Sequence, residues 1–258
     1  MRLVNAAQQQ PETAQETGTI PGPARKPDEL CQFCFGSGME MMPRYSDLTT
    51  QEQRGGARRC RCRVEADRAE ARRQALAVIP REFGVPRLHL IAPDAKRYAQ
   101  QFAKLEMLRS DPDRSYLICG RNGTGKSFFG WALYVHAIEQ GRRAAACTLY
   151  ELLKEYRRYT CQPAQNDWRP RVLPEDLKQN DTRWTIFLDE IHAATPSEFA
   201  TREFFYLLKA ATEYGHQMIY TCNVKPEVLH QRWSSVNEFE GDSIARRLAE
   251  YSKRIEMF

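Results

Sequence analysis

A glycine-rich loop near the middle of the chain constrains its fold more than any other feature. Residues 119–127 read CGRNGTGKS, and Gly120, Gly125, Lys126 and Ser127 match the pattern G-x-x-x-x-G-K-[ST]. Glycines let the backbone curl so that its N–H groups point at phosphate oxygens. A helix that begins at such a loop adds the partial positive charge of its N-terminus. The loop therefore predicts a site for the phosphates of a nucleotide.

The segments beside the loop are those that such a site requires. Residues 115–119, SYLIC, are a short apolar run typical of a buried strand, and residues 127–140 have helical apolar spacing. Lys126 is then expected to reach the β- and γ-phosphates, and the Ser127 hydroxyl to ligate Mg²⁺. We expect ATP with Mg²⁺ to be bound by the loop residues Gly120, Arg121, Asn122, Gly123, Thr124, Gly125, Lys126 and Ser127.

Further apolar runs alternate with helical patterns in the second half of the chain. The sequence predicts strands at 144–150, 184–188 and 217–223 and helices at 151–159 and 203–215. Short apolar strands that alternate with helices are typical of a parallel sheet with helices on both faces. The predicted fold class is therefore α/β, a P-loop nucleoside triphosphatase with a parallel sheet.

An acidic pair follows the apolar strand WTIFL. Asp189 stands at the end of this strand and is expected to hold Mg²⁺ together with Ser127. Glu190 comes next and can polarise a water molecule against the γ-phosphate. A carboxylate that activates water favours hydrolysis over transfer to a second substrate, so the pair predicts an ATPase.

Four polar residues later in the chain are considered for further roles. Asn223 ends the strand QMIYTCN and can orient the attacking water, or it can simply begin the following turn. His192 is interpreted as a turn residue rather than a base. Arg246 and Arg247 lie in a helical segment, where one of them can stabilise the transferring phosphate across a subunit boundary. The alternative is that both belong to a solvated helix face.

Four of the eight cysteines form a cluster near the N-terminus. Cys31 and Cys34 are separated by two residues, and Cys60 and Cys62 by one. Four thiolates form a closed tetrahedral site, so we expect a structural Zn²⁺. The alternative is four buried or free thiols, but a segment this poor in apolar residues offers little core. Metal binding would supply the stability that such a small module lacks.

The composition changes along the chain and predicts three parts. Residues 1–27 are polar and rich in Gln, Pro and Gly, which predicts a disordered tail. Residues 28–79 contain the cysteines and an arginine-rich helix at 63–79. Its arginines can contact nucleic-acid phosphates or an acidic protein, or form local pairs with neighbouring acids. Residues 80–258 are expected to form the ATPase domain.

Net charge and hydropathy limit the partners and the location. The formal net charge of +5 permits an acidic partner such as nucleic acid but does not require one. The chain has no apolar run of 18 residues and no apolar stretch of signal-peptide length at its N-terminus. We therefore expect a cytoplasmic protein without membrane contact.

Together these motifs resemble the AAA+ ATPases of the bacterial helicase-loader class. These are the DnaC- and DnaI-type loaders, to which the IstB-type helpers of transposases are related. The resemblance covers about residues 80–258 and rests on IPREFGV, GRNGTGKS, IFLDEIH, YTCN and GDSIARRLAE. It implies that Asn223 is the first sensor residue and that Arg247, which precedes Leu248, is the arginine finger rather than Arg246. A second sensor arginine is not identifiable, because the chain ends in RIEMF.

The resemblance also implies a function. We expect a slow, switch-like ATPase that docks on the replicative DNA helicase through its cysteine module. It would help to load the helicase on single-stranded DNA and would self-associate through its ATPase domain. The alternatives are an IstB-type transposition helper on duplex DNA, a non-catalytic zinc-dependent adaptor and a P-loop kinase. The sequence leaves open the identity of the partner, the oligomeric state and the DNA preference.

Overall fold

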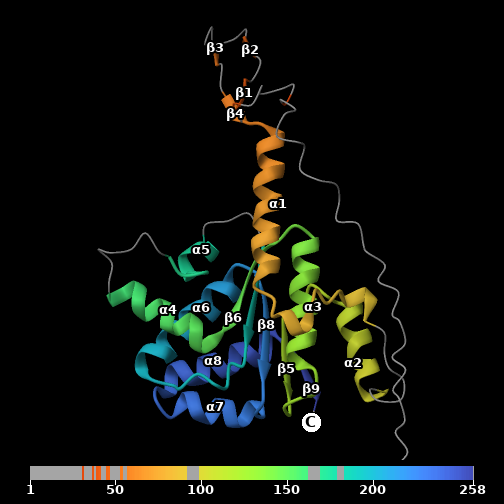
Figure 1. Cartoon of the computed structure of the whole chain (residues 1–258). Helices are drawn as coiled ribbons and strands as arrows, with labels where there is room; N and C mark the ends of the chain where they lie inside the picture. Colours follow the sequence, from red (N-terminus) through yellow and green to blue (C-terminus); the bar gives the residue numbers. More distant parts are fainter. Residues whose placement is uncertain are drawn as a thin grey trace, which may run out of the picture. The chain divides into compact units, whose positions relative to one another are not determined.

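A computed structural model describes most of the chain, which forms two compact units, Met1–Asp67 and Arg68–Phe258. The tail predicted as disordered (1–27) and the predicted metal ligand Cys34 lie outside the described residues. The structure describes residues 31, 37, 39–41, 45–46, 53–54, 57–91, 99–161, 169–178 and 183–257 (Figure 1).

The described part of the first unit contains two short antiparallel strand pairs. β1 (Met39–Met41) pairs with β4 (Ala57–Arg59), with Met39 opposite Arg59. β2 (Tyr45–Ser46) pairs with β3 (Gln53–Arg54). α1 (Arg61–Ala77) begins directly after β4 and Cys60.

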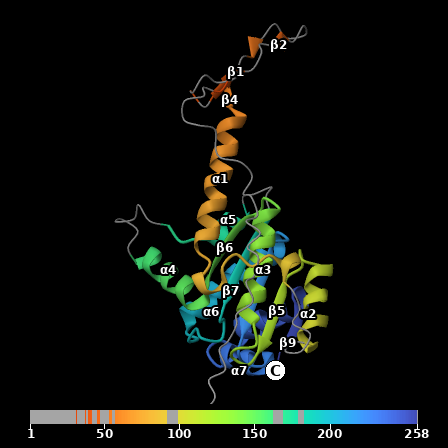
Figure 2. The ribbon, with the colours of Figure 1, turned by 45° about the vertical axis from the view of Figure 1, so that its right-hand side comes forward.

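The second unit is built on a five-stranded sheet in which every neighbouring pair is parallel. The strand order is β6-β7-β8-β5-β9, so β5 is an internal strand between β8 and β9, and the loop that follows it begins at the end of this strand (Figures 1 and 2). This confirms the predicted fold class. The strands are β5 (Tyr116–Gly120), β6 (Arg143–Thr148), β7 (Trp184–Asp189), β8 (Gln217–Cys222) and β9 (Lys253–Met257).

Helices cover both faces of this sheet because its central strands are apolar on both sides. In β5, Tyr116 and Ile118 point into one apolar core, whereas Leu117 and Cys119 point into the other. All four side chains are buried. Burying a large apolar side chain contributes about 1.5–3 kcal/mol, so each layer of helices is held by many such contacts.

The two helix layers differ in size. One core is completed by the 3-10 turns η1 (Arg81–Phe83) and η2 (Leu88–Leu90), by α2 (Ala99–Ser110) and by α3 (Lys126–Glu139). The other is completed by α4 (Leu149–Cys161), α5 (Pro174–Lys178), α6 (Glu198–Glu213), α7 (Pro226–Ser234) and α8 (Glu238–Tyr251). Within the part of the chain that is described, no helix is long and apolar enough to cross a membrane.

One strand end differs from the prediction. The apolar run 144–150 was expected to be a strand throughout, but α4 already begins at Leu149. The Thr148 hydroxyl accepts a hydrogen bond from the Glu151 N–H at 3.1 Å, and the Glu151 carboxylate accepts one from the Thr148 N–H at 3.1 Å. This is a capping box of the form T-x-x-E, which starts a helix at this point.

The sequence analysis did not predict β9, which forms one edge of the sheet beside β5. Ile255 and Met257 are buried, whereas Arg254 and Glu256, which alternate with them, are exposed. The strand lies very close to the start of the phosphate loop. A Cβ atom on Gly120 would lie 2.5 Å from the Met257 carbonyl oxygen, so only glycine fits there.

The two compact units divide within α1, between Asp67 and Arg68, and the end of this helix packs in the second unit. The expected domain boundary between residues 79 and 80 stays a prediction. Ala75 and Leu76 contact the core around α3, and Ile79 is buried there. The Tyr134 hydroxyl donates a hydrogen bond to the Ala75 carbonyl at 3.1 Å.

Candidate nucleotide-binding site and cysteine cluster

The predicted phosphate loop connects the end of β5 to the start of α3, as a nucleotide site requires. Gly123 and Gly125 have φ values of 76° and 89°, a left-handed conformation that strains any residue with a side chain. Gly125 is the N-cap of α3. The first N–H groups of this helix have no acceptor within the helix itself, so they are available to phosphate oxygens.

Lys126 is held inside the loop. Its side chain is only 6% exposed, and its ammonium Nζ donates a hydrogen bond to the Arg121 carbonyl at 2.8 Å. Burial lowers the pKa of Lys126, whereas the nearby carboxylates of Asp189 and Glu190 act in the opposite direction. Lys126 is the first residue of α3, so its ammonium group lies near the N-terminus of this helix, where the phosphates of a nucleotide would add negative charge.

Ser127 and Asp189, far apart in sequence, meet beside Lys126. The Ser127 hydroxyl donates to Asp189 Oδ1 at 3.0 Å. Adjacent ligands of an octahedral Mg²⁺ at its usual bond length are about 3.0 Å apart, so the two oxygens fit this ion. The structure thus brings together the two residues that the sequence predicted as magnesium ligands.

Thr221 is a part of this site that the sequence analysis missed. Its hydroxyl donates to the same Asp189 oxygen and accepts a hydrogen bond from the Glu190 N–H at 2.9 Å. It thereby fixes the Asp189 carboxylate and the backbone at Glu190 together. The signal in the sequence was a hydroxyl residue within the apolar run QMIYTC, and the structure shows that this side chain is buried.

Glu190 has an unusual backbone conformation. Its φ of 51° makes it the one non-glycine residue in the left-handed region among those described. The hydrogen bond to Thr221 and a second bond, from the Ile191 N–H to the Thr221 carbonyl at 3.0 Å, hold this turn. Glu190 is exposed at the edge of the sheet where β7 ends.

Asn223 and His192 lie side by side at the same edge. The Asn223 N–H donates to Nδ1 of the His192 ring at 3.3 Å. Burial lowers the pKa of His192, and the positive charges of Arg232 and Lys126 lower it further, against the effect of Glu190 and Asp189. His192 lies in a turn, as predicted, but its ring also belongs to the site.

The two candidate arginines of α8 differ in exposure. Arg246 is exposed, whereas Arg247 is partly buried. The Arg247 guanidinium lies over the Phe205 ring at 5.0 Å and donates to the Ser243 carbonyl at 3.4 Å. Stacking on an aromatic ring restricts an arginine without neutralising it. The assignment of the finger to Arg247 stays a prediction.

Three of the four predicted zinc ligands lie together in the first unit. Sγ atoms of Cys31, Cys60 and Cys62 lie within 4.8 Å of one another, and those of Cys31 and Cys60 are 3.6 Å apart. A disulfide requires about 2.05 Å, whereas two thiolates on a tetrahedral Zn²⁺ at the usual bond length are about 3.8 Å apart. None of the described cysteines forms a disulfide. The cluster therefore fits a metal better than a disulfide.

Much of the charge on the arginine-rich helix is paired locally. Ion pairs join acids and arginines three or four positions apart in α1, which supports the local-pair interpretation for these side chains. The pairs are Arg61–Glu65, Arg63–Asp67 and Arg73–Glu70.

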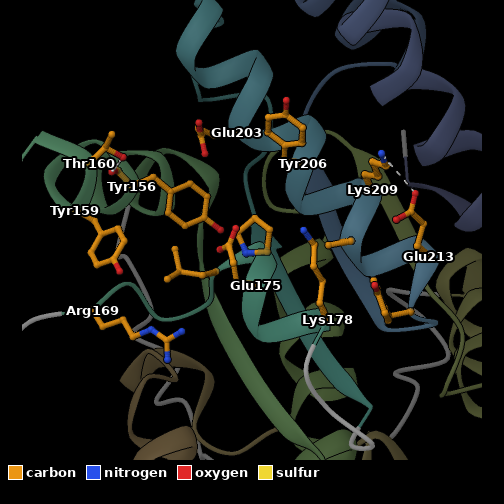
Figure 3. A pocket seen from close by; sticks show the side chains of 14 residues that line it. Tyr156, Tyr159, Thr160, Arg169, Glu175, Lys178, Glu203, Tyr206, Lys209 and Glu213 are labelled. Carbon is orange, nitrogen blue, oxygen red and sulfur yellow. Dashed lines mark hydrogen bonds and ion pairs between the residues drawn. The ribbon is translucent and has the colours of Figure 1, made fainter. Parts of the chain in front are cut away.

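A cavity of about 700 Å³ lies between α4, α5 and α6 (Figure 3). Three basic and three acidic side chains line it, so their charges balance: Arg169, Lys178 and Lys209, and Glu175, Glu203 and Glu213. Lys209 and Glu213 pair with each other at 3.9 Å. None of the lining residues belongs to the phosphate loop or to the acidic pair. The cavity is therefore separate from the nucleotide site, and its charge does not favour a polyanion.

The three consecutive aromatic residues of α6, Phe204, Phe205 and Tyr206, differ in their surroundings. Phe204 is fully buried and packs against Trp233. Tyr206 is 47% exposed and lines the cavity instead. Adjacent residues of a helix point in different directions, so three consecutive aromatics cannot share one face.

The parallel sheet order and the phosphate loop after β5 match the AAA+ P-loop fold. Two solved structures have a similar fold. The chain is similar to the DnaC helicase loader, with 14% identity and a TM-score of 0.53 over 69% of this chain and 100% of that one. It is also similar to AMPPCP-bound DnaA from Aquifex aeolicus, with 16% identity and a TM-score of 0.51 over 67% of this chain. The match spans 50% of the DnaA chain. No protein-family model and no curated protein matches the sequence.

Proposed function

We propose that this chain is an ATP-hydrolysing DNA replication protein that docks on the replicative helicase and helps to load it on single-stranded DNA. The observation that carries the proposal is the contact between Ser127 and Asp189 beside the buried Lys126, within a fold shared with the DnaC helicase loader. The expected cofactors are ATP, Mg²⁺ and a structural Zn²⁺, and the proposed location is the cytoplasm.

The residues of the site have distinct roles in this proposal. Lys126 and the loop amides bind the phosphates, and Mg²⁺ held by Ser127 and Asp189 would neutralise charge on them. Glu190 accepts a proton from the attacking water, whose orientation Asn223 maintains. Lys126 is buried, so its charge acts in a medium of low dielectric and is screened less than at the surface.

The proposed self-association completes the site. Arg247 lies on α8, which packs mainly on α6 and α7. A second copy of the chain would then provide Arg247 to the γ-phosphate of its neighbour. In this arrangement the rate of hydrolysis depends on how the subunits pack. ATP then controls the conformation of the assembly rather than serving mainly as an energy source.

For the first unit, we propose that Cys31, Cys34, Cys60 and Cys62 hold Zn²⁺ and that the module docks on the helicase. Elemental analysis of the full chain should find about one zinc per chain. We expect Cys31→Ser with Cys34→Ser to lose it, because a tetrahedral site with two thiolates does not retain the ion. Cys161→Ser is the matched control, since Cys161 is exposed at the end of α4, and it should retain the zinc. A folded, metal-free chain would refute the zinc site.

Capture of the replicative helicase of the host cell by the full chain tests the function itself. We expect binding that depends on ATP and that is lost in the chain with Cys31→Ser and Cys34→Ser. Single-stranded DNA should change the rate of ATP hydrolysis. No helicase binding, with binding of a transposase and duplex DNA instead, would contradict the loader and indicate a transposition helper. Helicase binding by a chain that does not bind ATP would indicate the alternative function, a non-catalytic zinc-dependent adaptor.

A further inference from the structure

The turn after β7 is bound to the end of β8 through alternate residues of that strand. The N–H groups of Glu190 and Ile191 are both bound by Thr221, at 2.9 and 3.0 Å. Two residues further along, the Asn223 N–H is bound by the His192 ring at 3.3 Å. The turn that carries the proposed water-activating carboxylate is therefore tied to the residue proposed to orient the same water.

The bond to His192 provides an acceptor for a backbone N–H that has no register partner in the sheet. The last paired positions of β8 are Cys222, opposite Cys119 on β5, and Tyr220, opposite Leu188 on β7. The Asn223 N–H lies beyond both pairs, so neither neighbouring strand provides a register partner for it. A partly buried N–H without an acceptor costs free energy, and the imidazole removes this cost.

The chemistry of the ring suits this role. Nδ1 accepts the hydrogen bond only when it carries no proton, which places the proton of a neutral imidazole on Nε2. The backbone of His192 is also bound, because Arg232 Nη1 donates a hydrogen bond to the His192 carbonyl at 3.3 Å. Both bonds restrict the ring and the backbone at the same point of the turn.

We propose that His192 is a positioning residue, which fixes Asn223 relative to Glu190 through its bond to the Asn223 amide. This proposal rests on the proposed hydrolysis of ATP. This role requires no contact between His192 and the phosphate or the water. Without the bond, Thr221 still holds the turn to β8, but Asn223 is no longer fixed relative to Glu190, so the two residues that must act on one water lose their alignment.

Two substitutions separate this role from simple packing. His192→Phe keeps the ring but has no acceptor, whereas His192→Asn places Oδ1 at the same number of bonds from Cβ as Nδ1. We expect His192→Phe to reduce kcat about tenfold, with less than about twofold change in the affinity for ATP. His192→Asn should stay within about threefold of the unchanged chain. His230→Phe, which alters an exposed histidine of α7 paired with Asp242, is the matched control and should have no effect.

Hydrogen exchange at the Asn223 amide, measured on the full chain without nucleotide, tests the bond itself. We expect exchange about three to ten times faster in His192→Phe and near-normal exchange in His192→Asn. Equal exchange in all variants would refute the bond, and altered exchange with normal kcat in His192→Phe would refute the positioning role. An impaired His192→Asn would also contradict it. If the unchanged chain does not hydrolyse ATP, the proposed function and the positioning role both fail, while the exchange measurement still decides whether the bond exists.

Discussion

Lys126→Ala is expected to weaken ATP binding by at least about 100-fold. In its proposed role the ammonium group would make hydrogen bonds to the β- and γ-phosphates, each worth about 1.5–3 kcal/mol, and 1.4 kcal/mol corresponds to a factor of ten. No other described lysine lies in the loop, so no neighbour replaces it. Calorimetric titration of the full chain with ATP and Mg²⁺ measures the loss.

The control for this substitution is Lys209→Ala. Lys209 is an exposed residue of α6 and lines the separate cavity, so ATP affinity should not change. Thermal unfolding of both variants checks that Lys126→Ala is folded. A folded Lys126→Ala chain with unchanged ATP affinity would show that the loop is not the nucleotide site.

Glu190→Gln is expected to retain ATP and to lose hydrolysis by about 100-fold or more, which is the usual effect of removing a general base. Glutamine has nearly the same shape as glutamate, so the left-handed φ of 51° has a similar cost in both and the turn is preserved. Phosphate release under saturating ATP measures the rate, and titration measures the affinity.

Glu213→Gln, at the far end of α6, is the matched control and should hydrolyse ATP normally. Normal turnover by Glu190→Gln would remove Glu190 from the catalytic role. Loss of ATP binding in the same variant would instead assign Glu190 to nucleotide binding.

Mixing inactive variants tests whether the site is shared between subunits. Arg247→Ala and Glu190→Gln should each be inactive alone, yet a mixed assembly contains interfaces with an intact Glu190 on one side and an intact Arg247 on the other. We therefore expect the mixture to recover activity. Arg246→Ala is the control, because Arg246 is the exposed neighbour. Absence of recovery would place the effect of Arg247 within its own chain.

The features that the sequence predicts are those that depend on the properties of residues close together in the chain. The turns of the phosphate loop depend on Gly123 and Gly125, whose backbone freedom is a property of the residue itself. The apolar runs of β5, β7 and β8 identify strands buried on both faces. Cys31, Cys60 and Cys62 were recognisable because thiols rarely gather in a segment with so little apolar surface.

Other parts were not predictable because their signals are weak or non-local. β9 reads KRIEM, in which three of the five residues are charged, and it is recognisable as a strand chiefly through its partner β5. Thr221 was passed over as an ordinary strand residue, although it binds both Asp189 and the backbone at Glu190. His192 was interpreted only as a turn residue, since nothing in its neighbours in sequence indicates a bond to Asn223.

The sequence by itself determined a phosphate loop at the start of a helix, an acidic pair at the end of a strand and a parallel sheet. Each of these depends on residues that are adjacent in the chain, where spacing alone sets the geometry. Only the tertiary structure decided that Ser127 meets Asp189, that Met257 lies against Gly120 and that Asn223 is bound by His192. These contacts join separate elements, so they depend on strand order and register, which a local pattern does not contain.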